Sequence, residues 1–221
     1  MRLLPARLAG VITIAFLVAA CGGTGPSTGT ASPGATTSPT AAALGPPAAT
    51  PLAEPPAEPA GDGTTATIRT ELGGIVIELF NESAPVATEN FTNLAQAGYY
   101  DGVVFHRLVP GFVIQGGDPD GTGTGGPGYT IQDEPVVGEY ARGIVAMARA
   151  QQPNSQGSQF FIVLDDAAAP ALESYRTYVI FGRVTAGMDV VDKIAAMPNS
   201  GGQANQALDP VAMTEVTIQR P

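Results

Sequence analysis

The stretch FHRLVPGFVIQGGD at residues 105–118 shapes the expected fold more than any other part of the chain. Two short apolar runs, at 103–108 and 112–115, flank a Pro-Gly pair, which predicts two β-strands joined by a turn. Arg107 and Gln115 interrupt these runs close to aromatic residues. Polar groups that recur among aromatic ones predict an apolar pocket with a few directed hydrogen bonds.

Further strand-like runs follow one another between Gly and Pro positions. They lie at residues 74–80, 143–148, 160–164, 179–184 and 211–219. Helical spacing is found at 84–97, with Ser83 or Asn81 as the expected cap and Gly98 as the expected stop, and again at 188–197. Many short strands with two helices predict a mainly-β domain over residues 67–221, built as a closed antiparallel β-barrel or a sandwich.

The first 20 residues have the pattern of an export signal. Two arginines precede an apolar run at 8–20, which is too short for a permanent membrane-spanning helix. The sequence VAACG at 18–22 then leads into Cys21, the only cysteine, and resembles the lipobox of bacterial lipoproteins. We therefore predict a signal peptide over 1–20 and a lipid on Cys21 that anchors the protein outside the cytoplasm, at the bacterial cell membrane. The alternative is a plain signal peptide or anchor with an incidental cysteine.

A tether of unusual composition follows, which we place at residues 21–66. Residues 22–66 hold 8 Gly and 9 Pro, and most of the others are Ala, Thr and Ser. Such a segment has too little bulky apolar surface to offset the entropy lost on ordering, so it is predicted to be disordered. As a random coil it would span about 35–40 Å.

The composition limits the chemistry that is available. The chain carries 20 acidic and 10 basic residues, a net charge of -10, which opposes binding to nucleic-acid phosphates. One Cys and one His exclude an intramolecular disulfide and a zinc cluster of several Cys and His ligands.

The remaining motifs favour structural roles. The GTGTGG sequence at 121–126 formally fits a dinucleotide-binding pattern, but Pro127 follows where a helix would have to start, so we interpret it as a flexible loop. No GxSxG motif accompanies His106, which favours a hydrogen-bonded structural histidine over a catalytic one. The pairs Asp118/Asp120 and Asp133/Glu134 are expected to be solvated turn residues.

Several motifs in the same order resemble the cyclophilin family of peptidyl-prolyl isomerases. They are the stretch at 105–118, GTGG at 123–126, MARAQQPNSQGSQFFIVL at 147–164 and VIFGRV at 179–184. The resemblance covers nearly all of residues 67–221. It implies a closed eight-stranded antiparallel β-barrel capped by two helices, and peptidyl-prolyl cis-trans isomerase activity without a cofactor or a metal.

The resemblance also implies roles for individual residues. Arg107 would be the central catalytic side chain, and Gln115 would act beside it. The substrate-binding residues would be Phe112, Val113, Gly123, Ala148, Arg149, Ala150, Gln159, Phe161, Leu172 and Tyr178. The chain departs from the common pattern at Val113, Arg149 and Tyr178, where many members have Met, Asn and His, and it lacks tryptophan.

The implied mechanism needs no nucleophile. Amide resonance opposes rotation about the X-Pro bond, and the twisted state exposes a lone pair on the prolyl nitrogen to which Arg107 could donate. The expected partners are proline-containing polypeptides, and we expect a monomer. The alternatives are a non-catalytic proline-peptide-binding module or chaperone with the same groove, and a hydrolase that uses His106.

Overall fold

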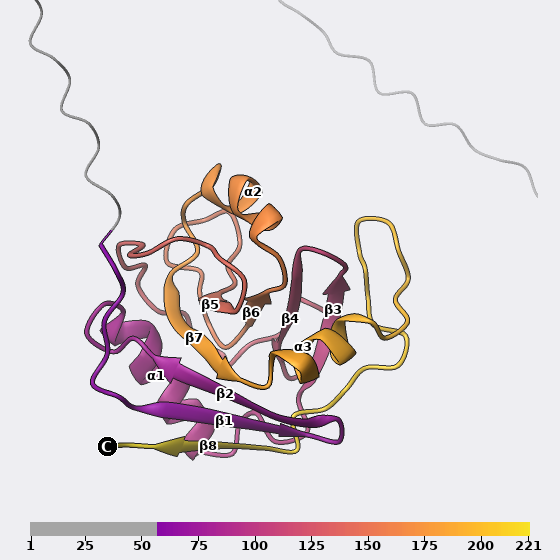
Figure 1. Cartoon of the computed structure of the whole chain (residues 1–221), viewed down its shortest axis with the longest axis horizontal. Helices are drawn as coiled ribbons and strands as arrows, with labels where there is room; N and C mark the ends of the chain where they lie inside the picture. The colour runs from indigo at the N-terminus through magenta and orange to yellow at the C-terminus, as the bar shows by residue number, and fades with distance from the viewer. Residues whose placement is uncertain (1–56) are drawn as a thin grey trace, which may run out of the picture. The chain divides into compact units, whose positions relative to one another are not determined.

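The computed structural model describes residues 57–221, in which eight antiparallel strands form one curled sheet (Figure 1). The strands are β1 (Thr65–Thr70), β2 (Gly73–Leu79), β3 (Val104–Val109), β4 (Val113–Asp118), β5 (Ile144–Met147), β6 (Phe160–Val163), β7 (Ile180–Ala186) and β8 (Glu215–Gln219). Their order across the sheet is β3-β4-β6-β5-β7-β2-β1-β8. The short apolar runs of the sequence therefore form strands, as predicted.

The sheet is a half-barrel rather than the closed eight-stranded barrel that we expected. Strand β8 pairs with β1, and its other neighbour is not β3. The chain that leads into β8 runs along β3 instead, with Phe105 N–H donating to the Val211 carbonyl at 3.0 Å and Ala207 N–H donating to the His106 carbonyl at 2.8 Å. These contacts are isolated bridges, so the two edges of the sheet are joined by irregular chain.

Three α-helices accompany the sheet, one more than predicted. Helix α1 (Pro85–Gln96) packs beside β7 and β8, and α3 (Met188–Ala195) packs beside β2, β3 and β4. Helix α2 (Ala169–Glu173) follows a 3-10 turn at Asp166–Ala168 and lies at the end of the sheet remote from β8 (Figure 1). At five residues α2 is too short to show helical periodicity in the sequence.

Helix α1 begins differently from the prediction. Its N-cap residue, Ala84, makes no side-chain cap, and Ser83 and Asn81 do not cap the helix. The Glu134 carboxylate fills this place, because its two oxygens accept hydrogen bonds of 2.9 Å from the N–H groups of Val86 and Ala87. A carboxylate at this end also suits the helix dipole. A cap from 48 residues away is not visible in local sequence.

Two apolar clusters fill the two sides of the sheet. The larger contains an aromatic group in which Phe160 makes edge-to-face contacts with its neighbours, at centroid distances of 5.6 to 6.4 Å. The smaller cluster includes Val113, Phe161 and Leu172, together with Tyr140 and Ile180. Full burial of one such side chain stabilises the fold by about 1.5–3 kcal/mol. The smaller cluster supports the site described below.

The folded domain begins before the predicted boundary at residue 67. Strand β1 starts at Thr65, and the backbone N–H groups of Ala60 and Asp62 donate to the side chains of Ser83 and Asn81 at 2.8 and 2.9 Å. The last residues assigned to the tether thus belong to the domain. The predicted signal peptide, Cys21 and the tether up to residue 56 lie outside the described residues. Within residues 57–221, no helix is both long and apolar enough to cross a membrane.

Candidate active site

Arg107 and Gln115 lie opposite each other on strands β3 and β4. The two residues are register partners, and Arg107 Nη1 donates a hydrogen bond to Gln115 Oε1 at 3.4 Å. Both side chains are half-buried. No carboxylate forms an ion pair with Arg107 among residues 57–221, so its charge is balanced only by dipoles and solvent.

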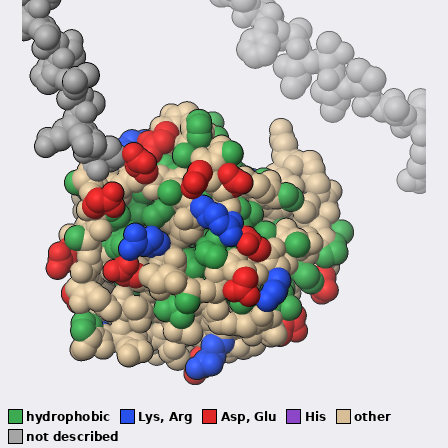
Figure 2. Space-filling view, in the orientation of Figure 1, with side chains coloured by type: hydrophobic (Ala, Val, Ile, Leu, Met, Phe, Trp, Pro, Cys, Tyr) green, Lys and Arg blue, Asp and Glu red, His purple; other side chains and the backbone are tan. Residues whose placement is uncertain are grey.

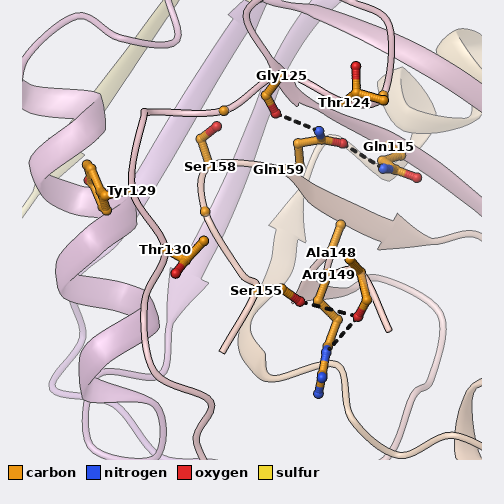
Figure 3. A pocket seen from close by; sticks show the side chains of 14 residues that line it. Gln115, Thr124, Gly125, Tyr129, Thr130, Ala148, Arg149, Ser155, Ser158 and Gln159 are labelled. Atoms are coloured by element: carbon orange, nitrogen blue, oxygen red, sulfur yellow. Dashed lines mark hydrogen bonds between the residues drawn. The ribbon is translucent and has the colours of Figure 1, made fainter. Parts of the chain in front are cut away.

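Gln115 connects this arginine to a longer row of amides. Its Nε2 donates to Gln159 Oε1 at 2.9 Å, and Gln159 Nε2 donates to the Gly125 carbonyl at 2.8 Å (Figure 3). Each hydrogen bond in the row fixes the orientation of the next amide, since an amide has its oxygen on one side and its NH₂ on the other. The row therefore aims the Gln115 oxygen at the guanidinium of Arg107.

An apolar pocket of about 390 Å³ lies beside the arginine. Its lining residues are Arg107, Phe112, Val113, Gln115, Ala148, Arg149, Phe161, Ala171, Leu172, Tyr175 and Tyr178. The Phe161 and Tyr178 rings meet edge to face at 5.4 Å, which fixes one wall. Val113 and Leu172 come from β4 and α2, and both are almost fully buried. The sequence had predicted an apolar pocket at this place, because Arg107 and Gln115 interrupt runs that contain aromatic residues.

A second pocket, of about 460 Å³, adjoins the first, and the two share Gln115, Ala148 and Arg149. Figure 3 shows Gln159, Gln115 and Gly125 on one side of it and Ala148, Arg149 and Ser155 on another. The predicted residues Gly123, Ala150 and Gln159 line this second pocket only. The structure thus distributes the twelve predicted site residues over two adjoining pockets.

A buried carboxylate organises the glycine-rich loop at the rim. Asp118 has no exposed surface, contrary to the solvated position that we expected. It accepts hydrogen bonds from the backbone N–H groups of Asp120, Gly123 and Gly125. Burial alone would raise the pKa of Asp118, but these N–H groups and the nearby His106 outweigh burial and hold its pKa below the usual range. The same loop presents the Gly125 carbonyl to Gln159.

His106 is buried, as a structural histidine should be, but it is not hydrogen-bonded as predicted. Its side chain lies behind the glycine-rich loop near Gly123, and neither ring nitrogen has a hydrogen-bond partner among the described residues. Burial lowers the pKa of the imidazole. With no Ser hydroxyl bonded to it in this part of the chain, His106 does not form a catalytic dyad, and the hydrolase alternative loses its basis.

Sequence reasoning missed several residues that line the two pockets. Tyr175 lies at the mouth of the first pocket and is 71% exposed, while Thr124, Tyr129 and Ser155 line the second. Tyr175 sits in the short α2 region, which the sequence did not show as an element. A bulky aromatic residue in a polar loop was the available signal.

The described residues offer no cluster for a metal ion, and the face in Figure 2 carries no continuous basic stripe. Among residues 57–221, no group of three or more His, Cys, Asp or Glu side chains could hold a metal ion. Acidic and basic side chains are interspersed on the face in Figure 2, and no continuous basic stripe crosses it. The arrangement can bind a neutral, partly apolar chain segment and donate hydrogen bonds to it.

Comparisons with known proteins agree with this geometry. The sequence model described as "Cyclophilin type peptidyl-prolyl cis-trans isomerase/CLD" matches residues 65–218. A peptidyl-prolyl cis-trans isomerase of Schizosaccharomyces pombe is 48% identical over 132 residues, which cover 58% of this chain and 82% of the relative. One from Helicobacter pylori is 46% identical over 133 residues, covering 58% of this chain and 78% of the relative.

A solved structure shares the fold as well. It is the crystal structure of a Cryptosporidium parvum cyclophilin type peptidyl-prolyl cis-trans isomerase in the presence of the dipeptide Ala-Pro. The match has a TM-score of 0.64 at 35% sequence identity and covers 71% of this chain and 99% of the other. A family match over most of the described chain, a cyclophilin-like half-barrel and an arginine beside an apolar pocket lead to one assignment. The chain belongs to the cyclophilin family and is a peptidyl-prolyl cis-trans isomerase.

Proposed function

We propose that this isomerase acts on proline-containing polypeptides outside the cytoplasm, held at the membrane by a lipid on Cys21. The observation that carries the catalytic part is Arg107 on the wall of the apolar first pocket, oriented by Gln115, which Gln159 in turn holds from the second pocket. The part that concerns location rests on the sequence of residues 1–21. The two parts need separate experiments.

Arg107 is the proposed catalytic residue. Rotation about a peptide bond has a barrier of about 18–20 kcal/mol, because amide resonance is lost on the way. In the twisted state the prolyl nitrogen regains a lone pair, which accepts a hydrogen bond that the planar amide cannot accept. A guanidinium that donates to this nitrogen binds the transition state more tightly than the substrate, which is the condition for catalysis.

One hydrogen bond does not account for the whole acceleration. A hydrogen bond to a charged group supplies about 1.5–3 kcal/mol, whereas a millionfold acceleration needs about 8 kcal/mol. The remainder is assigned to the first pocket. Phe112, Val113, Phe161 and Leu172 would hold the proline ring and favour the less polar, twisted amide, and Tyr178 supports Phe161 from its edge.

Gln115 and the second pocket would hold the neighbouring residues of the peptide. The amide of Gln115 lies at the junction of the two pockets, next to Ala148 and Arg149. An extended peptide with its proline in the first pocket would pass this junction and place a side chain in the second, between Gly123, Ala150 and Gln159. The Cryptosporidium structure was determined in the presence of the dipeptide Ala-Pro, and a proline of that kind is what we propose for the first pocket here.

The lipid anchor is tested by a substitution that replaces one atom. Cys21→Ser replaces the sulfur that would carry the lipid and leaves the isomerase domain unchanged. In a bacterial host that lipidates lipoproteins, we expect the wild-type chain in the membrane fraction and the Cys21→Ser variant released from it or retained as an uncleaved precursor. Equal membrane association of both chains, with the signal removed from each, would refute lipidation at Cys21.

Client folding is tested with the full chain and a substrate whose refolding is limited by proline isomerisation. Catalysis of the slow phase by substoichiometric enzyme supports the proposal. Suppression of aggregation at equimolar amounts, with an unchanged slow phase, would favour the non-catalytic chaperone instead.

A further inference from the structure

The side chain of Arg149 is directed into a loop and not into the groove. Arg149 Nη1 forms an ion pair of 3.0 Å with Asp133 Oδ2, and the Arg149 side chain is only 8% exposed. Its Nε donates to the Ala150 carbonyl at 3.1 Å, and its Nη2 donates to the Gln152 carbonyl at 2.7 Å. In Figure 3 the bonds from Arg149 and Ser155 converge on one carbonyl, that of Ala150.

Asp133 holds the same loop from its other end. Its Oδ2 accepts a hydrogen bond of 2.9 Å from Asn154 N–H, and its own N–H donates to Asn154 Oδ1 at 2.9 Å. Its Oδ1 accepts from Gln156 Nε2 at 2.9 Å, and Gln156 is fully buried. One carboxylate therefore ties the segment before β5 to both the middle and the end of the 150–156 loop. The sequence had indicated only a solvated turn residue at this position.

This arrangement leaves the main chain of Arg149 free. Arg149 lines both pockets, and its backbone N–H and C=O have no hydrogen-bond partner among residues 57–221. The residue before it is fixed, because Ala148 N–H donates to the Gln159 carbonyl at 2.9 Å. A free N–H and C=O on a fixed segment at the edge of a groove can pair with an extended peptide. The guanidinium, occupied by the loop, does not obstruct them.

We infer that the Arg149–Asp133 pair is a positioning device for substrate binding. The pair fixes the 150–156 loop, and through it the main chain at 148–150 that the peptide would pair with. The inference rests on the proposed function of that main chain. It assigns the two charged side chains to the capture of the peptide and not to the rotation of its X-Pro bond.

The test compares kcat and KM for the full chain on a proline peptide with at least two residues on each side of the proline. Arg149→Met keeps the length of the side chain and removes every donor. Asp133→Asn keeps its size and removes the charge. For each variant we expect KM to rise roughly tenfold, because the peptide must then order a loop that the pair no longer fixes, and kcat to stay within about twofold.

Arg69→Met is the matched control. Arg69 forms an ion pair of the same 3.0 Å length with Glu215, but these side chains are 62% and 53% exposed, and neither lines a pocket. KM should not change in this variant. Arg149→Lys should lie between wild type and Arg149→Met, because it keeps a charge for Asp133 but has fewer donors for the loop carbonyls.

Two outcomes would overturn the inference. One is a KM within twofold of wild type in both Arg149→Met and Asp133→Asn. The other is a fall in kcat with KM unchanged, which would place the pair in the chemical step. If Arg149→Met does not fold, Asp133→Asn and Arg149→Lys decide alone. Wild-type turnover is measured in the same series, so a failure of the proposed function would appear as its absence.

Discussion

Arg107 and the exposed Arg220 are the two arginines of residues 57–221 that form no ion pair, and of these only Arg107 lines a pocket. Arg69, Arg142, Arg149, Arg176 and Arg183 each form an ion pair of 3.0 Å or less with a carboxylate. Arg107 forms no ion pair in the described part of the chain, and its orientation is set by the hydrogen bond that it donates to the Gln115 oxygen. A guanidinium already paired with a carboxylate would gain less from a new acceptor. The unpaired state of Arg107 therefore suits a group that donates to a nitrogen in the transition state.

The buried imidazole of His106 makes the stability of the fold depend on pH. Burial lowers the pKa of His106 in the folded protein, whereas the unfolded chain has the ordinary value of about 6.5. The unfolded chain therefore binds more protons below pH 6.5, and the stabilisation present above that pH is lost as the pH falls towards the folded pKa. We expect the urea midpoint of the wild type to fall from pH 7.5 to pH 5.0, and to fall less in His106→Gln.

His106 is the only histidine in the chain, so no other side chain with an ordinary pKa titrates in this window. Equal shifts of the midpoint in the wild type and in His106→Gln would show that the buried imidazole has an ordinary pKa.

Local sequence could indicate which residues meet at the site, but not the contacts that hold them. Arg107 and Gln115 stand out as polar residues in apolar strands, and they do lie opposite each other. Asp118, Asp133 and Glu134 look like ordinary turn carboxylates, yet one is buried in a glycine loop, one is tied to Arg149 and one caps α1. Their partners are backbone N–H groups and side chains from other segments, which sequence spacing does not reveal.

Strands β4 and β6 are paired neighbours in the sheet, and both contribute residues to the site. Gln115 lies opposite Phe161 in this ladder, so one strand supplies the amide and its neighbour supplies the pocket wall. Gly117, near the end of β4, has a φ of 86° and lies against the backbone carbonyl of Ser158. Any side chain there would overlap that carbonyl.

Gly117→Ala therefore tests how tightly the site strands pack. The substitution adds a Cβ at positive φ that would overlap the backbone of Ser158 and Gln159, directly before β6, and we expect it to destabilise the fold by about 2–4 kcal/mol. Gly102→Ala is the control, since Gly102 has a φ of 82° but nothing within 4 Å of an added Cβ. The control should lose only the conformational part, about 1–2 kcal/mol. Equal losses in urea unfolding would contradict close packing between β4 and the chain that leads into β6.

The elements that sequence predicted are those with a strong repeating pattern. Strands β2 to β8 and the helices α1 and α3 have alternating or helical apolar positions that mark them without tertiary information, whereas β1 was not among the predicted runs. Helix α2 was missed because five residues cannot show a period, and the closed barrel was wrong because strand pattern does not say whether the two edges meet. The chain at 205–213 covers β3 through single bridges, which have no sequence signature.

The whole molecule combines a folded isomerase with an N-terminal region of different chemistry. The domain that the structure describes includes residues 60–64, which hydrogen-bond to the chain at 79–83 between β2 and α1, so the useful boundary for a truncated chain lies before residue 60 rather than at 67. Nearly all of the chemistry of the site comes from neutral amides, apolar rings and one cation. The enzyme can therefore catalyse its reaction although it has a single histidine and although its one cysteine, Cys21, precedes the domain by many residues.

The most direct measurement is the isomerisation rate of a proline peptide with the full chain and its Arg107→Ala and Arg107→Lys variants. Arg107 is half-buried and makes one side-chain hydrogen bond, of 3.4 Å, so the variants should fold with an unchanged urea midpoint. Loss of a charged hydrogen bond worth about 1.5–3 kcal/mol should lower kcat/KM about 10- to 150-fold in Arg107→Ala, mainly through kcat, and less in Arg107→Lys. A folded Arg107→Ala variant that retains kcat/KM within about threefold of wild type would contradict transition-state stabilisation by this arginine.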